Sequence, residues 1–316
     1  MNLTTFPDIL HARQRLAAHL RPTPLEMSEH LGKNIGFKLE NLNLTRSFKI
    51  RGALNAMLSL SLSLSDEEKS RGIVAASAGN HAQGVAYAAR LSGVNARVVM
   101  PANAPQRKVK GTQRLGAEVV LYGDTYDDAE EHARKLQAQD GMTFISPYND
   151  RQVIAGAGTI GLEIFDEMPD VERVIIPTSG GGLMAGIGLA CKTLNPALEV
   201  VGVQSVATPA MYNALYDTDY PQQDTLADGL SGEIEQGSIT VPLCKKVTDR
   251  IALVEEAQIE EAVRWMLQMH NWVVEGAVAV GIAALLSGEL AADDRPTVLI
   301  ISGTNIDYEK LRRLLG

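Results

Sequence analysis

Short apolar segments alternate with helical segments along most of this chain. Segments 173–177 and 297–302 are apolar apart from their ends, whereas 125–139 is charged and spaces its apolar residues as a helix does. Strands without a polar face are buried on both sides, as in parallel sheets that helices cover. The alternation therefore predicts an α/β fold of open, twisted, mostly parallel sheets flanked by helices.

The same patterns place the individual elements. Strands are expected at 35–39, 72–77, 96–101, 118–122, 144–146, 173–177, 199–204 and 297–302. Helices are expected at 81–91, 108–115, 125–139, 158–168, 183–193, 256–270 and 277–286. Ligands of such folds bind beyond the carboxyl ends of the strands. Small-residue loops lie there at Ser77, Ser179 and Ser302, so the sequence predicts a binding site at these loops.

Composition limits the classes of function. The 316 residues suggest about two domains at roughly 150 residues each. A net charge of −9 argues against binding a nucleic-acid backbone. Two cysteines cannot build a disulfide framework, and no apolar run approaches the ~18 residues of a membrane span. We expect a cytoplasmic protein without a targeting segment, with a small-molecule substrate and neither a nucleic acid nor a membrane as partner.

A lysine between two apolar residues is the first candidate for chemistry. Lys49 lies between Phe48 and Ile50 at the start of a helical segment. Removal from water lowers the pKa of a lysine and makes its amine a nucleophile suited to Schiff-base formation. The same spacing also fits a surface lysine on an amphipathic helix, so the residue pattern alone leaves both interpretations open.

Two glycine-containing loops are candidate anion sites. Each follows an apolar strand and begins a predicted helix, one at 77–84 and one at 178–186. Backbone N–H groups at a helix N-terminus bind carboxylate or phosphate groups. The second loop, with three consecutive glycines, lacks both the dinucleotide spacing and the Lys-Ser/Thr of a P-loop, so it predicts a site for one phosphate without Mg²⁺. Taken alone, the second loop also fits a tight strand-to-helix turn, and His81 in the first loop also fits a buried structural histidine.

A third loop follows the last predicted strand. Ser302 there could offer its hydroxyl to a ring atom of a ligand, or the loop could be a simple turn. A reactive lysine, a carboxylate loop, a single-phosphate loop and a ring-facing hydroxyl together describe a site for pyridoxal phosphate.

The motifs resemble those of the threonine/serine dehydratases. The resemblance rests on Ser-Phe-Lys-Ile-Arg-Gly-Ala at 47–53, Ser-Ala-Gly-Asn-His at 77–81 and the glycines at 180–182. Segments 155–163, 225–229 and 302–305 extend it, in order, over essentially the whole chain. These dehydratases belong to the fold type II, tryptophan-synthase-β-like, pyridoxal-phosphate enzymes, and serine racemases are close relatives.

The resemblance implies an organisation in two domains with the cofactor in the cleft between them. A large cofactor-binding domain would comprise residues 1–49 and 149–316, and a small, mobile domain on the substrate side would comprise 50–148. A homodimer or a higher homo-oligomer is also implied. The chain ends soon after the last motif, so we expect no C-terminal regulatory domain.

The resemblance also implies a role for each motif residue. The cofactor-binding residues would be Phe48, Lys49, Asn80, Ser179, Gly180, Gly181, Gly182, Leu183, Glu275 and Ser302. The substrate-binding residues, around the carboxylate, would be Ser77, Ala78, Asn80 and His81. Lys49 would be the catalytic residue, which holds the cofactor covalently and then moves protons. The implied reaction is α,β-elimination of the β-hydroxyl of L-threonine or L-serine, which yields 2-oxobutanoate or pyruvate and ammonia.

Departures from the family pattern bear on the alternatives. Serine racemases carry a second serine where this chain has Ala78, so efficient racemisation is not expected. Metal-dependent relatives carry acidic residues at or near Gln204 and Ala210, so no metal ion is expected. Arg46 and Thr304 replace glycines, which leaves open the dehydration of another β-hydroxy amino acid such as 3-hydroxyaspartate. A catalytically silent cofactor-binding protein is a further alternative, disfavoured by the intact lysine.

Overall fold

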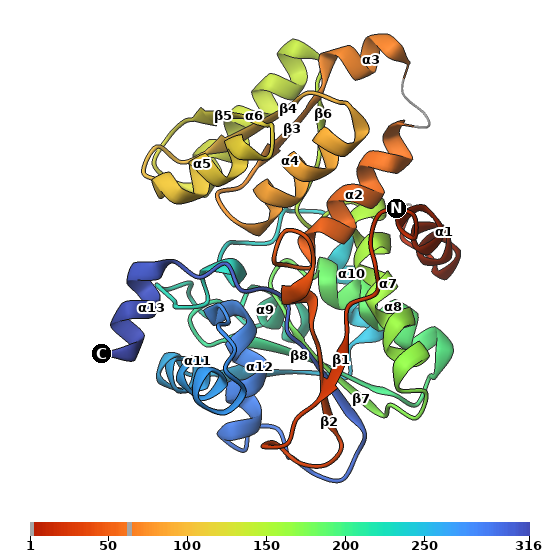
Figure 1. Ribbon diagram of the computed structural model, residues 1–316, viewed down its shortest axis with the longest axis vertical. Helices are drawn as coiled ribbons and strands as arrows, with labels where there is room; N and C mark the ends of the chain where they lie inside the picture. Colours follow the sequence, from red (N-terminus) through yellow and green to blue (C-terminus); the bar gives the residue numbers. More distant parts are fainter. Residues whose placement is uncertain (1–2, 62–64) are drawn as a thin grey trace.

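The computed structural model describes residues 3–61 and 65–316, and this part of the chain forms two sheets (Figure 1). The large sheet has the order β1-β2-β10-β7-β8-β9, and the small sheet has the order β5-β4-β3-β6. The large sheet contains β1 (Leu25–Met27), β2 (Ile35–Lys38), β7 (Arg173–Pro177), β8 (Glu199–Ser205), β9 (Arg250–Val254) and β10 (Thr297–Ile300). The small sheet contains β3 (Ile73–Ala76), β4 (Ala96–Met100), β5 (Glu118–Leu121) and β6 (Thr143–Phe144). Among the strands of the described residues only β1 and β2 pair antiparallel, which confirms the predicted mostly parallel architecture.

Helices cover both faces of each sheet. The helices are α1 (Phe6–Leu16), α2 (Lys49–Ser61), α3 (Asp66–Arg71), α4 (Asn80–Ser92), α5 (Gln106–Arg114), α6 (Tyr126–Asp140), α7 (Arg151–Glu167), α8 (Gly182–Leu194), α9 (Ala210–Tyr216), α10 (Thr240–Val247), α11 (Glu256–His270), α12 (Gly276–Leu286) and α13 (Tyr308–Leu315), with 3-10 turns η1 (Glu40–Leu42) and η2 (Asp228–Leu230). Alternate residues of β7 show why the interior of this strand is apolar. Ile175 packs with α11 and α12, whereas Val174 and Ile176 pack with α7 and α8.

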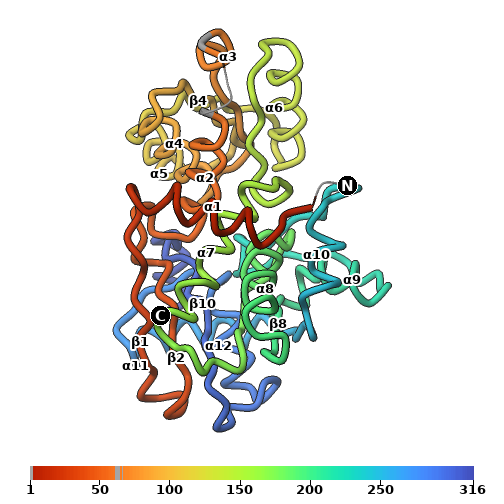
Figure 2. The backbone as a smooth tube through the Cα atoms, turned by 90° about the vertical axis from the view of Figure 1, so that its right-hand side faces the viewer, coloured from red at the N-terminus to blue at the C-terminus, as the bar shows by residue number. Residues whose placement is uncertain are grey.

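The small sheet is inserted in the chain between parts of the large one. In Figure 1 it lies above the large sheet, and α1 and α2 lie at the height where the two parts meet, as Figure 2 also shows. Two glycines let α2 approach α7 closely: a Cβ at Gly52 would lie 2.8 Å from Val153, and a Cβ at Gly156 would lie 2.5 Å from the backbone oxygen of Arg51. The division into domains at 49/50 and 148/149 stays a prediction.

Some element boundaries differ from the sequence patterns. The strand expected at 144–146 is Thr143–Phe144. Helix α7 begins at Arg151, seven residues before the expected start at 158, because the Asp150 side chain accepts hydrogen bonds from Gln152 N and Val153 N and caps the helix there. The patterns do not predict α1, β1, α9, α10 or β9, most of which are too short to show a period. None of the helices in the described residues combines the length and apolar composition needed to cross a membrane.

Candidate active site

Lys49 and the triple-glycine loop are joined by one short segment of chain. Lys49 is the first residue of α2, and its Nζ donates a hydrogen bond to the backbone oxygen of Pro147, 2.8 Å away. The ring of the next residue, Tyr148, packs on the loop so closely that a Cβ at Gly180 would lie 2.7 Å from it. The structure therefore brings together two motifs about 130 residues apart in sequence, 49 and 180.

The surroundings of Lys49 favour its neutral amine. The side chain is partly buried, and Nζ lies 5.1 Å from the centre of the Phe48 ring. Burial lowers the pKa of Lys49 from its ordinary 10.5 to about 8, and the carboxyl group of Glu275 opposes part of that shift. A substantial fraction of this amine is therefore unprotonated, and able to act as a nucleophile, at mildly alkaline pH.

Asn80 connects the small sheet to the loops of the large sheet. It is the first residue of α4, and its Nδ2 donates to Glu275 Oε1 at 2.7 Å. Its Oδ1 accepts a hydrogen bond from Asn305 Nδ2 at 2.6 Å. A Cβ at Gly303 would lie 2.1 Å from Glu275 Oε1, so the backbone after β10 touches the same carboxyl group. Burial raises the pKa of Glu275 to about 7, while the hydrogen bond from Asn80 opposes the rise.

The loop after β10 also contacts the lysine motif directly. Phe48 N donates to Ser302 O at 3.0 Å, and Ser47 forms an isolated bridge with Gly303. These bonds hold Ser302, which is buried, beside the start of α2. The three strand-end loops and Lys49 thus share one region, as the sequence predicts.

The side chain of His81 points into the interior. It is buried, and its Nε2 lies 2.9 Å from the backbone oxygen of Ile145. Burial and the nearby charge of Lys49 lower the pKa of His81 to about 3, so the ring is neutral. A carbonyl oxygen can only accept a hydrogen bond, so the single ring proton is assigned to Nε2. Nδ1 then carries no proton and cannot donate. Only the backbone N–H of His81 therefore offers a donor to a carboxylate.

The remaining loop residues form the starts of two helices. Ser77 Oγ accepts from Gly79 N at 3.1 Å and shapes the turn before α4, with Ala78 partly buried between them. Ser179 lies two residues after the end of β7, and Leu183 is the second residue of α8. The first N–H groups of a helix have no partner within it, so these two starts present backbone donors.

The backbone of the triple-glycine loop is strained for any residue other than glycine at its centre. Gly181 has φ of +85°, and a Cβ there would lie 2.4 Å from Met211 Cε. At Gly182 a Cβ would lie 3.0 Å from the backbone of Tyr148. Met211 and Tyr148 therefore pack against the loop. Because the glycines have no side chains, the loop backbone can contact a bound anion directly.

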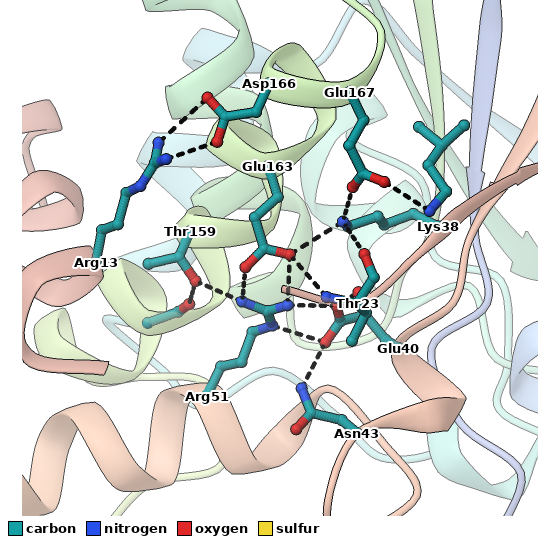
Figure 3. Close-up of polar contacts among 12 residues, drawn as sticks. Arg13, Thr23, Lys38, Glu40, Asn43, Arg51, Thr159, Glu163, Asp166 and Glu167 are labelled. Carbon is teal, nitrogen blue, oxygen red and sulfur yellow. Dashed lines mark hydrogen bonds and ion pairs between the residues drawn. The ribbon is translucent and has the colours of Figure 1, made fainter. Parts of the chain in front are cut away.

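A buried ion network fixes the start of α2, which carries Lys49 (Figure 3). Arg51 is 2% exposed and donates to both oxygens of Glu40, at 2.7 Å each, and to both oxygens of Glu163, at 2.5 and 2.8 Å. Lys38 Nζ lies 3.0 Å from Glu163 and 2.6 Å from Glu167. Burial works to raise the pKa of Glu40, but the charge and hydrogen bonds of Arg51 outweigh it and hold that pKa below its ordinary range.

Sequence reasoning assigns no role to several residues of this site. Arg51 and Glu163 lie within the quoted motifs, and a charged residue in an apolar helical segment is a signal that could have singled them out. Pro147 and Tyr148 carry no such signal, because one contributes a backbone oxygen and the other a ring that only the tertiary structure aims at the loop.

Comparison with known proteins identifies the family. The chain matches the family model described as pyridoxal-phosphate dependent enzyme over residues 16–303. This protein is a member of that family. It is 43% identical to the L-threonine ammonia-lyase of Thermotoga maritima, over 99% of this chain and 79% of the relative. It is 42% identical to the catabolic L-threonine dehydratase TdcB of Escherichia coli, over 98% of this chain and 95% of the relative.

Solved structures agree with this membership. The structure of maize serine racemase matches with a TM-score of 0.90 and 31% identity, and covers 99% of this chain and 97% of that chain. The family resemblance read from the motifs, the fold class and the pyridoxal-phosphate cofactor are thereby confirmed.

The protein's residues fit this cofactor. A partly buried amine of lowered pKa suits covalent attachment, and the packed glycine loop at the start of α8 suits one phosphate. The Nδ2 donor of Asn80, beside Glu275, suits an anionic ring substituent.

One departure from the family pattern creates backbone strain beside the site. Arg46, where the resemblance implies a glycine, is exposed and has φ of +59°. We expect Arg46→Gly to raise the free energy of unfolding by about 0.5 kcal/mol, because relief of the left-handed conformation exceeds the added entropy of the unfolded chain. Urea unfolding measures the difference, and a lower midpoint for the variant would contradict it. Asp217→Gly, at φ of +56° on an exposed helix end, is the matched control.

Proposed function

We propose that this protein is a pyridoxal-phosphate dependent threonine/serine ammonia-lyase. It eliminates the β-hydroxyl of L-threonine, and of L-serine, and yields 2-oxobutanoate or pyruvate and ammonia. The observation that carries the proposal is the amine of Lys49, which lies at the junction of the three loops with a pKa of about 8. The threonine-acting relatives, at 42% and 43% identity, support this substrate class over that of the serine racemase at 31%.

The residues of the site divide the work. When bound, the cofactor supplies the electron sink for cleavage at Cα. The backbone N–H groups of Ser179, Gly180, Gly181, Gly182 and Leu183 hold its phosphate. Lys49 anchors it and then removes the Cα proton of the substrate as a general base.

Other residues orient the ring of the cofactor and the carboxylate of the substrate. With the cofactor bound, Asn80 would donate to the ring oxygen, Phe48 would lie against the ring, and Ser302 would face the ring nitrogen. The backbone and side-chain donors at 77–81 hold the substrate carboxylate. A neutral hydroxyl at the ring nitrogen does not protonate it, which suits rapid loss of a leaving group better than a long-lived carbanion.

Two of the alternatives lack the residue that they need. Racemisation requires a proton donor on the opposite face of the cofactor, and the methyl group of Ala78 exchanges no proton. A metal ion at Gln204 would need free oxygen ligands, but both ends of that amide bind backbone: Nε2 donates to Thr208 O and Oε1 accepts from Tyr212 N. We therefore include the absence of a metal requirement in the proposal.

A substrate panel tests the reaction. Purified protein loaded with pyridoxal phosphate is given L-threonine, L-serine and 3-hydroxyaspartate, and 2-oxo acid and ammonia are measured for each. The proposal expects the highest kcat/KM for L-threonine, with equal activity in the presence of a chelator. Higher kcat/KM for 3-hydroxyaspartate would instead assign a role to the cation of Arg46. No 2-oxo acid from any of them, or formation of D-serine, would overturn the proposal.

The division of the chain belongs to the same proposal. Residues 50–148 would move as a small domain over residues 1–49 and 149–316 and close the cleft on the substrate, which excludes water from the reaction. We place this enzyme in the cytoplasm and as a homodimer or higher homo-oligomer.

The pH dependence of cofactor capture tests the state of Lys49. Only the unprotonated amine reacts, so the rate of capture by cofactor-free protein should rise about tenfold from pH 6 to 7 and level off above about pH 8.5, since the pKa is about 8. Stopped-flow absorbance measures the rate. In Glu275→Gln the plateau should begin at lower pH, because the carboxyl group raises the pKa of Lys49. A rate that keeps rising to pH 10 would show an ordinary lysine.

A further inference from the structure

We infer that Asn305 is a positioning residue, which fixes the side-chain amide of Asn80 with its nitrogen toward Glu275 and the cofactor ring. This inference deepens the proposed function and rests on it. It assigns a role to a residue for which the motifs gave none, and it follows from a chain of hydrogen bonds whose direction is set at one end.

The chain of bonds begins at a backbone oxygen. Asn305 Nδ2 donates to Thr45 O at 3.0 Å and to Asn80 Oδ1 at 2.6 Å. A peptide oxygen can only accept, so the amide of Asn305 must direct its nitrogen to this side. The opposite orientation would place Asn305 Oδ1 against Thr45 O, with two acceptors facing each other. Thr45 thereby determines how Asn305 lies.

Asn305 in turn determines how Asn80 lies. The nitrogen of Asn305 offers only donors, so the end of the Asn80 amide that meets it must be the acceptor, Oδ1. The other end, Nδ2, then faces Glu275 Oε1 at 2.7 Å. An amide nitrogen carries two N–H groups, and in the described residues the structure gives Asn80 Nδ2 this one acceptor. The second N–H is available to an oxygen of the bound ring.

Burial and backbone hydrogen bonds hold both ends of this chain of bonds. Thr45 is buried in the loop before α2, and Asn305 follows β10 by a short loop whose Thr304 N donates to Arg46 O at 3.1 Å. Asn80 begins α4, so the bonds run from the large sheet to the small one. A wrongly turned Asn80 would present an oxygen to the anionic oxygen of the ring and to Glu275, and each contact would change from attraction to repulsion.

Substitution of Asn305 tests the orientation directly. Asn305→Asp keeps the size of the side chain. Its carboxylate can only accept, so it draws Nδ2 of Asn80 toward itself and away from the ring. We expect the dissociation constant for pyridoxal phosphate, measured by titration of cofactor-free protein, to rise about tenfold or more. Asn305→Ala removes the orienting donor without reversing it, so its dissociation constant should lie between those of the wild type and Asn305→Asp. If Asn305→Asp does not fold, Asn305→Ala alone must still bind more weakly than the wild type.

A double-mutant cycle separates positioning from a structural role. If Asn305 acts through Asn80, Asn305→Asp should weaken binding less than about twofold in an Asn80→Ala background. The matched control is Asn103→Asp, since Asn103 Nδ2 also donates to a backbone oxygen, that of Asp124, on the small sheet. The control should bind the cofactor as the wild type does.

Each outcome bears on one of the two claims. A wild-type protein that binds no pyridoxal phosphate overturns the proposed function. If the wild type binds it and Asn305→Asp or Asn305→Ala binds equally well, only the inference about Asn305 fails. It also fails if the effects of Asn80→Ala and Asn305→Asp add, because Asn305 would then act independently of Asn80.

Discussion

Lys49→Met is expected to lower kcat for 2-oxo acid formation by at least about 10³-fold and to abolish the visible absorbance of the cofactor-loaded protein. The substitution removes both the nucleophile that anchors the cofactor and the base that takes the Cα proton, and proton transfer alone contributes roughly 10²–10⁴-fold. Methionine has a similar length and no charge to bury, so we expect the thermal midpoint to stay near that of the wild type. Absorbance spectra and a coupled assay of 2-oxo acid measure the two losses.

The control for this experiment is a lysine with comparable exposure and no part in the site. Lys192 on α8 has a side chain that is 22% exposed and pairs with Asp249 at 2.7 Å. Lys192→Met should retain the absorbance and the activity. An active Lys49→Met protein would remove the central residue of the proposed function, whereas loss of both properties in Lys192→Met would point to general damage to the fold.

Arg51→Met is expected to lower the free energy of unfolding by about 3–5 kcal/mol. The guanidinium binds two buried carboxylates, Glu40 and Glu163, and its removal leaves both without that partner in the interior. Chemical denaturation measures the loss. The ion pair of Arg13 and Asp166 is the exposed control (Figure 3). Both side chains are about half exposed, so Arg13→Met should lower the free energy of unfolding by less than about 1 kcal/mol.

Two further measurements show that charge, and not packing, causes the loss. The triple variant Arg51→Met, Glu40→Gln and Glu163→Gln removes the stranded carboxylates and should regain part of the stability. The pH dependence has a defined sign. The pKa of Glu40 is lowered by folding, so its contribution is present above the ordinary value of 4.5 and is lost as pH falls below it. The difference in the free energy of unfolding between the wild type and Arg51→Met should therefore become smaller at acidic pH. An equal loss for the single and triple variants would contradict this explanation.

The network also explains why the motif around Lys49 extends beyond the lysine. Arg51 lies half a helical turn after it, and Phe48 O accepts from Arg51 N at 2.9 Å. Glu163 on α7 and Glu40 in η1 therefore hold, through one side chain, the first turn of α2, which carries Lys49. An arginine at the start of a helix is more often a solvated surface residue.

The sequence by itself determined the fold class and the loops that meet near Lys49. Wholly apolar strands require cover on both faces, and β7 shows it, with Val174 and Ile175 packed on opposite layers. Glycines between a strand and a helix require close contact of the backbone, and Gly181, at φ of +85°, confirms it. These inferences depend on local geometry, which neighbouring residues fix.

Only the tertiary structure decided which way the polar side chains point. The family resemblance implies that His81 lies around the substrate carboxylate, and the residue pattern also fits a buried structural histidine; in the structure its ring bonds Ile145 O in the interior. Lys49 donates to Pro147 O and Asn80 accepts from Asn305, and both of these partners are distant in sequence. A side chain's hydrogen bonds and its pKa depend on the groups that folding brings within about 3 Å, and no local pattern contains that information.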